Sequence, residues 1–226
     1  MKRVLEELLS ATNTWAKRNQ INNPWADVKH NLPKVSNSDR SKKAWSSQEV
    51  EEILRRMKEV YPAWYSYVAF LAWTGCRPEE AIALEWEDIC LKSGSVSISK
   101  VFTHGSLVNR TKTGSGRLIN VGGKVRDMLR SCYSTHEKIV FPAPKGGYIN
   151  QNNFNRRKFK PVVQSLKDQG KVSKVLPTYN LRNTFITLLL GKGLNLATVA
   201  KMAGTSERMI LAHYWGADNS IVIPDI

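Results

Sequence analysis

The chain has 226 residues, 42% of them hydrophobic, which is enough apolar chain for one domain with a packed core. Its 34 Lys and Arg outnumber 19 Asp and Glu, giving a formal net charge of +15, so we expect a polyanionic partner: nucleic acid first, an anionic membrane surface second. No run approaches the roughly 18–20 apolar residues of a membrane span, and three cysteines without CxxC spacing argue against a zinc site or disulfide framework.

The first part of the chain contains two helical patterns separated by a polar stretch. Residues 4–19 predict an amphipathic helix, and residues 23–43 are irregular, basic and interrupted by prolines, as in a linker. "WSSQEVEEILRRMKEV" then predicts a helix capped by Ser46 or Ser47. Its predicted apolar face consists of Val50, Ile53, Leu54 and Met57.

Two further helices meet around an arginine. The apolar stretch "YVAFLAWTG" predicts a helix that ends at Gly75, and Pro78 predicts the start of the next, since glycine and proline favour those positions. Arg77 therefore lies near a helix N-terminus, where backbone N–H groups and a cation together favour an anion. The alternative is a salt bridge to Glu79 or Glu80.

Between Gly94 and Val121 the apolar period changes from helix to strand. "SVSISKVF" alternates, and "SLVNRTK" and "GRLINV" follow with "TGSG" at their junction. This pattern predicts a small antiparallel sheet that ends in a hairpin.

The rest of the chain returns to helical patterns, three of them ended by glycine. The predicted helical segments are Lys124–Cys132, Gln151–Lys167, 181–193, 195–204 and 206–216. The sequence therefore predicts an α+β fold that is mainly helical, with one small antiparallel three-stranded sheet.

A search for catalytic motifs leaves mainly basic residues. Four histidines are scattered without metal-ligand spacing, and neither GxxxxGK[ST] nor GxSxG is present, which argues against a metal site, a nucleotide-driven motor and a serine hydrolase. The remaining candidates lie beside element ends: Arg77, Arg110, Lys112, Arg117, Arg182 and Tyr214. Singly, each has a structural interpretation, such as a solvated lysine, a helix cap or a half-buried tyrosine.

Taken in chain order, these motifs resemble the catalytic domain of the tyrosine recombinases, the phage-integrase family. "TGCRPEEAIALEWEDI" resembles the first arginine box, with Arg77 and the structural acid Glu80. "NRTKTGSGRLINV" resembles the hairpin that carries the catalytic lysine, here Lys112. "LPTYNLRNTFITLLLGKGLNLATVAKMAGTSERMILAHY" resembles the second arginine box and the nucleophile helix, with Arg182 and Tyr214.

Two positions depart from the family pattern. Tyr179 stands where the family has histidine, and Thr205 where it has histidine or tryptophan. The resemblance thus implies the catalytic set Arg77, Lys112, Tyr179, Arg182, Thr205 and Tyr214. Both replacements keep a hydroxyl donor for a phosphate oxygen, but neither can act as a general base near neutral pH as histidine does.

The resemblance also implies a reaction and a domain organisation. Tyr214 would cleave and rejoin DNA through a 3′-phosphotyrosyl intermediate, without metal or cofactor. The implied parts are the end of an N-terminal core-binding domain (1–22), a linker (23–43), the catalytic domain (44–216) and a C-terminal tail (217–226). We expect a homotetramer on double-stranded DNA and a monomer when free, with no membrane partner. We expect a prokaryotic or phage-encoded protein that is cytoplasmic and associated with the nucleoid.

Two alternatives stay open at this point. One is a degenerate, non-catalytic relative that occupies recombination sites, which the replacements at Tyr179 and Thr205 favour. The other is a topoisomerase-like relaxase with the same chemistry. Further basic residues are expected to follow the DNA backbone: residues 40–43, Lys92, Lys100, residues 155–160, Lys171 and Lys174.

Overall fold

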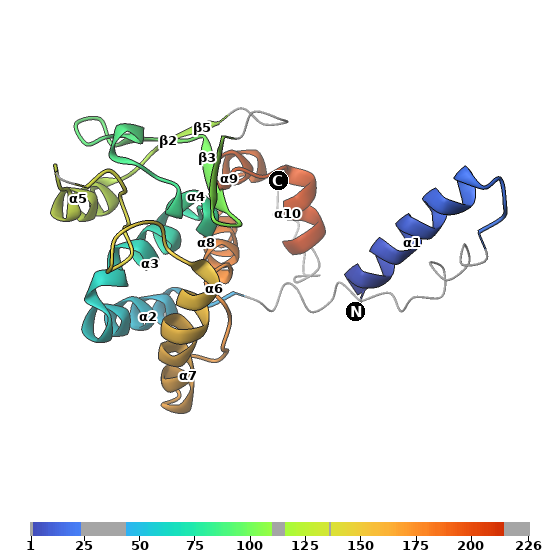
Figure 1. Ribbon diagram of the computed structural model, residues 1–226. Coiled ribbons are helices and arrows are strands. Elements are labelled where there is room, and N and C mark those ends of the chain that lie inside the picture. The colour runs from blue at the N-terminus through green and yellow to red at the C-terminus, as the bar shows by residue number, and fades with distance from the viewer. Residues whose placement is uncertain (1, 24–43, 110–115, 136, 215–226) are drawn as a thin grey trace, which may run out of the picture. The chain divides into compact units, whose positions relative to one another are not determined.

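The computed structural model describes residues 2–23, 44–109, 116–135 and 137–214, and the chain divides into two compact units, residues 1–37 and 38–226 (Figure 1). In the first unit, α1 (Lys2–Arg18) covers nearly all of the predicted 4–19 helix. Its Leu8 and Trp15 are 56% and 57% exposed. Nearly all of the predicted linker and the whole predicted tail lie outside the described residues.

The second unit begins with three helices, and the predicted start of the first, end of the second and start of the third are confirmed. The Ser46 side chain caps α2 (Ser47–Val60) by accepting from the Glu49 N–H, while the Glu49 carboxylate accepts from the Ser46 N–H at 2.7 Å. The residues of the predicted apolar face are all buried: Val50, Ile53, Leu54 and Met57. Next, α3 (Pro62–Thr74) ends at Gly75 in the left-handed conformation, and α4 (Pro78–Ile82) begins at the expected proline.

The predicted three-stranded antiparallel sheet is present, but its strands differ from those expected. Its order is β1 (Ile89–Cys90), β2 (Ser95–Ile98) and β5 (Arg117–Asn120), following the 3₁₀-helix η3 (Trp86–Asp88). A separate hairpin contains β3 (Lys100–Thr103) and β4 (Ser106–Asn109).

The hairpin expected between "SLVNRTK" and "GRLINV" is therefore wrong for the described strands. The reason is that β5 pairs with β2, whereas β4 pairs with β3. Ser99 divides the alternating run between β2 and β3, so that its two halves enter different sheets. Each strand is only four residues long, which leaves the choice of partner to tertiary contacts.

A helix with one π turn covers the predicted 151–167 segment. After α5 (Gly123–Cys132), the chain forms α6 (Gln151–Phe154), the π-helix η4 (Asn155–Phe159) and α7 (Lys160–Asp168) without a break. The Asn155 side-chain oxygen accepts from the Thr178 N–H at 3.1 Å. This contact connects the π turn to the segment that leads into α8.

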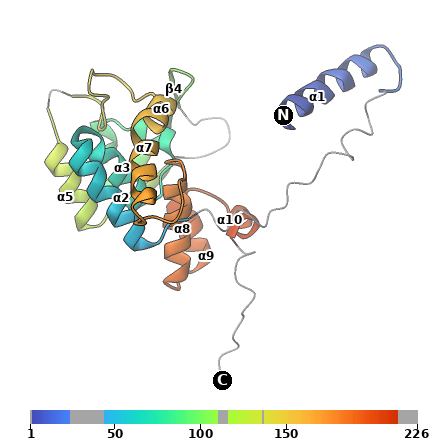
Figure 2. The ribbon, with the colours of Figure 1, turned by 90° about the horizontal axis from the view of Figure 1, so that it is seen from below.

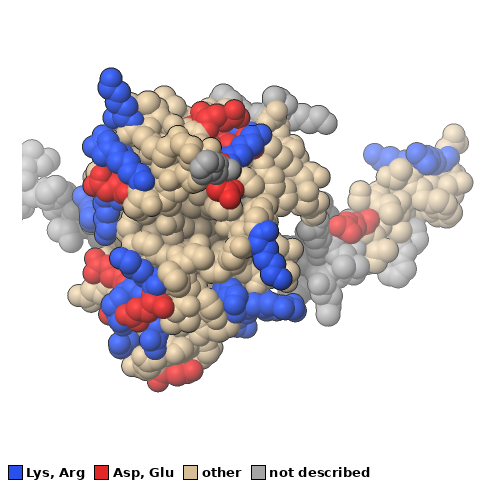
Figure 3. All heavy atoms as spheres, turned by 60° about the vertical axis from the view of Figure 1, so that its left-hand side comes forward, with Lys and Arg blue, Asp and Glu red and all other residues tan. Residues whose placement is uncertain are grey.

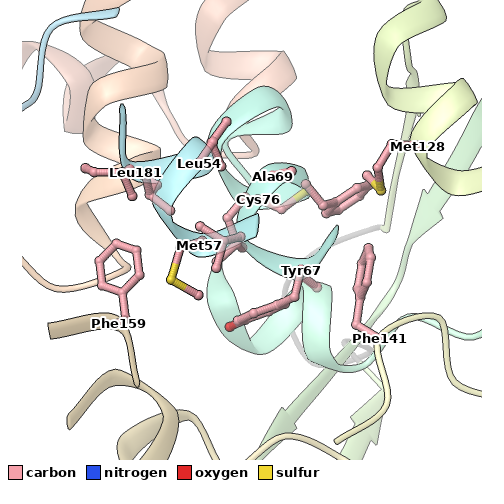
Figure 4. Close-up of a cluster of buried hydrophobic side chains, with 14 of the residues drawn as sticks. Leu54, Met57, Tyr67, Ala69, Cys76, Met128, Phe141, Phe159 and Leu181 are labelled. Carbon is pink, nitrogen blue, oxygen red and sulfur yellow. The ribbon is translucent and has the colours of Figure 1, made fainter. Parts of the chain in front are cut away.

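The last three helices are α8 (Asn180–Gly191), α9 (Leu196–Ala203) and α10 (Glu207–Tyr214), which lie side by side in both ribbon views (Figures 1 and 2). They share a small apolar cluster: Ile186, Val199, Ala200, Ala203 and Ile210. The main core is separate and gathers side chains such as Met57, Tyr67 and Phe159 (Figure 4). Cys76 belongs to this main core, so the residue before Arg77 is anchored there.

Candidate active site

Arg77 occupies the joint between α3 and α4 that the sequence predicted. It is the N-cap residue of α4, with Cys76 on one side, 1% exposed, and the buried Pro78 on the other. Its own side chain is 21% exposed. The core thus fixes the backbone on both sides, and the guanidinium extends from a rigid point toward the surface.

Glu80 is the acid that Arg77 contacts, and it is shared with Arg117. Arg77 Nη1 donates to Glu80 Oε1 at 2.8 Å, and Arg117 Nη2 donates to Oε2 at 2.7 Å. Burial by itself would raise the pKa of Glu80, but the hydrogen bond and charge of Arg117, together with the Arg77 backbone N–H, lower it to about 2. Glu80 is therefore ionised and orients two guanidinium groups. The salt-bridge alternative for Arg77 holds for Glu80.

Arg182 projects from the first turn of α8 and is 3% exposed. Its Nη1 donates to the Gly75 carbonyl at 2.9 Å and to the Ala203 carbonyl, and its Nη2 donates to the Gly204 carbonyl at 3.4 Å. These contacts use three of the five N–H groups of a guanidinium. Because the acceptors are carbonyls, they orient the Arg182 charge without neutralising it.

The two arginines predicted as catalytic lie close together. Burial and then the positive charge of Arg77 lower the pKa of Arg182. Gly75 allows the end of α3 to lie close to α8, because it has a φ of 64° and a Cβ there would lie 2.3 Å from the Phe185 ring of α8. We call Arg77, Glu80, Arg117 and Arg182 the arginine cluster. Two of its guanidinium groups pair with the Glu80 carboxylate, and the third, that of Arg182, is close enough to affect them electrostatically.

Tyr179 and Thr205 occupy two chain segments that border Arg182. Tyr179 is the N-cap residue of α8, is 46% exposed, and is near enough to act electrostatically on the pKa of Arg182. Thr205 is half-buried and follows Gly204, whose carbonyl Arg182 contacts. Lys112 lies outside the described residues. Of Tyr214, the structure describes only the backbone, at the end of α10.

Arg117 is the member of the cluster that sequence reasoning did not place in the site. Along β5, Arg117 and Ile119 are partly buried, whereas Leu118 and Asn120 are exposed. The sequence signal that could have indicated an internal partner is that Arg117 lies two residues before the apolar Ile119, because side chains two residues apart in a strand lie on one face.

Lys100, which was expected to follow a DNA backbone, is instead paired with acidic side chains in this structure. Its ammonium lies 2.7 Å from Glu85, 2.9 Å from Asp88 and 3.2 Å from Glu87, and is 12% exposed. Figure 3 shows the wider pattern on one face, where basic groups often lie beside acidic ones around a largely uncharged centre. A basic residue in the sequence therefore does not by itself identify a surface that binds a polyanion.

No cluster of His, Cys, Asp and Glu that could hold a metal ion occurs among the residues that the structure describes. Across the same described ranges, every helix is too short or too polar to cross a bilayer. Among these residues, the arginine cluster brings three basic side chains and one acidic side chain together.

Comparison with known proteins gives this arrangement a family context. Residues 43–220 match the family model described as "Phage integrase family". The chain belongs to this family. The family resemblance proposed from the motifs, and the mainly helical fold with a small antiparallel sheet, are thereby confirmed.

Two curated relatives match part of the chain. The TnP I resolvase of Bacillus thuringiensis is 25% identical over 143 residues, which is 63% of this chain and 46% of the resolvase. The integrase of Staphylococcus phage L54a is 24% identical over 152 residues, covering 59% and 42% of the two chains. The matched regions thus span less than half of each relative.

Solved structures with the same fold include recombinases in complex with DNA. The integrase of transposon Tn1549, bound to transposon right-end DNA, superimposes with a TM-score of 0.73 at 18% identity, covering 95% of this chain and 75% of that one. The XerA recombinase gives a TM-score of 0.62 at 17% identity, covering 95% and 71%. A lambda integrase dimer bound to a core site gives 0.58 at 13% identity, covering 81% and 51%.

Proposed function

We propose that this chain is the catalytic part of a site-specific recombinase that cleaves and rejoins double-stranded DNA through a phosphotyrosine at Tyr214. The observation that carries the proposal is the arginine cluster, in which one buried carboxylate pairs with Arg77 and Arg117 while Arg182, bonded only to carbonyls in the described contacts, lies nearby. Positive charge that is desolvated and left in excess is costly unless an anion binds there. A DNA phosphate has the charge and the oxygen geometry that such groups bind.

The arginines would act on the transition state. Attack on a phosphodiester places negative charge on the nonbridging oxygens, and fixed guanidinium donors stabilise that charge without having to reorganise. Removing one such donor typically raises the barrier by about 3–4 kcal/mol, a rate loss of roughly a hundred- to a thousandfold. Arg77 at the rim of the cluster and Arg182 supply these donors, and Arg182 is held in place by hydrogen bonds that it donates to three carbonyls.

The bond changes follow from the proposed roles. The Tyr214 phenol oxygen forms a bond to phosphorus while the bond to the 5′-oxygen breaks, and Lys112 gives that oxygen its proton. The phenol proton leaves to water or to a phosphate oxygen. Tyr179 and Thr205 hold the phosphate by hydrogen bonds. Because phosphodiester energy is retained in the covalent intermediate, rejoining needs neither ATP nor a cofactor.

Relatives described with DNA support DNA as the partner, and assembly as a tetramer on DNA is part of the proposal. The test is covalent trapping from a library of nicked duplexes with a randomised site, followed by denaturation and sequencing of protein-bound DNA. We expect an adduct that maps to Tyr214 and disappears in Tyr214→Phe. Tyr133→Phe is the matched control, since Tyr133 is 49% exposed and packs against Trp86. Equal trapping by Tyr214→Phe would rule out this nucleophile.

A second candidate is a non-catalytic relative that occupies recombination sites. The observation that favours it is the pair Tyr179 and Thr205, which stand where the family pattern has residues such as histidine and cannot replace a base near pH 7. It predicts sequence-selective retention of duplex without any adduct that survives denaturation. Restoring Tyr179→His and Thr205→His together would then be expected to produce trapping.

A further inference from the structure

Arg117 contacts several parts of the candidate site. Its Nη2 lies 2.7 Å from Glu80 Oε2 and 3.7 Å from the Cys76 Sγ, and its side chain is 14% exposed. The Arg117 Nε is buried and has no partner in the part of the chain that the structure describes. A guanidinium that bonds Glu80 and contacts Cys76 can hold neighbouring groups in place.

Gly204 lies directly against this guanidinium. A Cβ added to Gly204 would lie 2.4 Å from Arg117 Nη1 and 2.6 Å from its Cζ, and Gly204 has a φ of +68°. The Gly204 carbonyl accepts from Arg182 Nη2 at 3.4 Å. Arg117 therefore packs against the turn between α9 and α10, and the Gly204 carbonyl in this turn accepts a hydrogen bond from Arg182.

Glu80 gives Arg117 a second route to the catalytic arginines. One Glu80 oxygen accepts from Arg117 and the other accepts from Arg77 Nη1, while the Arg77 backbone N–H also bonds the carboxylate at 3.0 Å. Without Arg117, the buried carboxylate would lose the bond to its Oε2 and could turn toward Arg77. The remaining N–H groups of Arg77 would then point differently.

From these contacts we infer that Arg117 is a positioning residue, which sets the direction of Arg77 through Glu80 and of Arg182 through the Gly204 turn. The inference rests on the proposed function of the site. Arg117 begins β5, just after the segment that carries Lys112, so it also joins that strand to both arginines. Misplacement of a reacting group by about 1 Å can cost roughly a hundredfold in rate.

The first test separates positioning from a purely structural ion pair. Arg117→Met removes the charge and keeps much of the volume, and Arg117→Lys keeps a single-point charge. We expect Arg117→Met to lower the single-turnover cleavage rate constant about ten- to a hundredfold at saturating DNA, with half-saturation changed less than about twofold, and Arg117→Lys to recover part of the rate. Arg130→Met is the matched control, because Arg130 is 51% exposed and pairs with Asp127.

The second test approaches the same contact from Gly204. Gly204→Ala drives a methyl group into the guanidinium, whereas Gly170→Ala, at a φ of +70° with no atom within 4 Å, introduces only the backbone strain. We expect similar losses of stability in both, and slower cleavage in Gly204→Ala alone. The comparison of the two glycine variants still tests the positioning role of Arg117 if Arg117→Met fails to fold. Equal rates in the two glycine variants would overturn the inference.

A third measurement does not depend on cleavage. Inorganic phosphate is titrated into the 226-residue chain while the side-chain N–H resonances of Arg77 and Arg182 are followed by NMR. We expect Arg117→Lys and Gly204→Ala to weaken phosphate binding about tenfold, with Arg130→Met and Gly170→Ala unchanged. If the wild-type protein forms no DNA adduct but shows this pattern, positioning holds and the recombinase proposal fails. If phosphate binding and cleavage are both unaffected, Arg117 is only a structural residue.

Discussion

Two buried glutamates near each other in the sequence, Glu80 and Glu85, have similar pKa values and opposite surroundings. Interactions with basic groups outweigh the effect of burial in each and lower the pKa to about 2. Glu80 faces Arg77 and Arg117, with Arg182 close by. Glu85 lies instead in what we call the Glu85 cluster: Glu85, Glu87, Asp88, Lys100 and Lys138.

The difference lies in the balance of charge. The arginine cluster contains one carboxylate, paired with two guanidinium groups, and a third guanidinium nearby, so positive charge is in excess among these residues. In the Glu85 cluster three carboxylates meet two ammonium groups. Within the described part of the chain, the charged groups of the Glu85 cluster pair with one another. The cluster therefore has no excess of positive charge that would attract an anion. A strongly shifted pKa therefore occurs in both places, and the sign of the excess charge is what indicates a ligand.

The largest expected effect comes from removing the charge of each glutamate. Glu80→Gln leaves Arg77 and Arg117 partly buried without their ion partner, and breaking a buried pair typically costs about 3–5 kcal/mol of unfolding free energy. Glu85→Gln should cost less, because Lys100 keeps Asp88 at 2.9 Å and Glu87 at 3.2 Å. Urea unfolding at pH 7 measures both.

Added inorganic phosphate should change the stability of these two variants to different extents. Because Glu80→Gln increases the unbalanced positive charge, added inorganic phosphate should restore part of the lost stability in that variant. It should do little for Glu85→Gln, whose cluster then has no excess of positive charge. Equal losses in the two variants, with no difference in phosphate response, would contradict the distinction between them.

The sequence located some of these features and not others, for physical reasons. Helix ends depend on local backbone chemistry, so a single sequence can predict them, as it does at Ser46, Gly75 and Pro78. The carbonyl partners of Arg182 come from residues 75, 203 and 204, which only the packing of α3, α8 and α9 brings together. The functional residues came from the family resemblance, and the catalytic roles of all six stay predictions.

The dependence on tertiary contacts also explains why the pairing of β5 and the surroundings of Lys100 were not predicted. Short strands choose partners by tertiary contact, so β5 pairs with β2 although β4 is nearer in sequence. In the sequence Lys100 is one basic residue among many, because its three acidic partners lie on the segment before β1. Arg117 differs in that its inward position on β5 was present in the alternation of the strand.

Acid should reveal the contribution of Glu80 to stability. Its folded pKa of about 2 lies below the usual value of 4.5, so the stabilisation is complete above pH 4.5 and is lost as the pH falls toward 2. The shift corresponds to a contribution on the order of 3 kcal/mol at neutral pH. In urea unfolding from pH 7 to pH 3, the gap between wild type and Glu80→Gln should narrow with acidity. A gap that is constant with pH would assign the loss to packing.

The smallest effect concerns binding to DNA of random sequence and separates basic residues with internal partners from exposed ones. Lys100 is held by three carboxylates, and Lys158 lies 4.5 Å from the Tyr61 ring centre, whereas Arg156 and Arg157 are exposed. Each phosphate that the protein no longer neutralises should lower the slope of log K against log salt by about 0.9. We expect this change for Arg157→Gln, and none for Lys100→Gln, in anisotropy titrations of a random duplex between about 50 and 200 mM salt. An equal slope change for Lys100→Gln would mean that the Glu85 cluster opens to release its lysine when DNA binds, and the contrast between the two clusters would then hold only for the free protein.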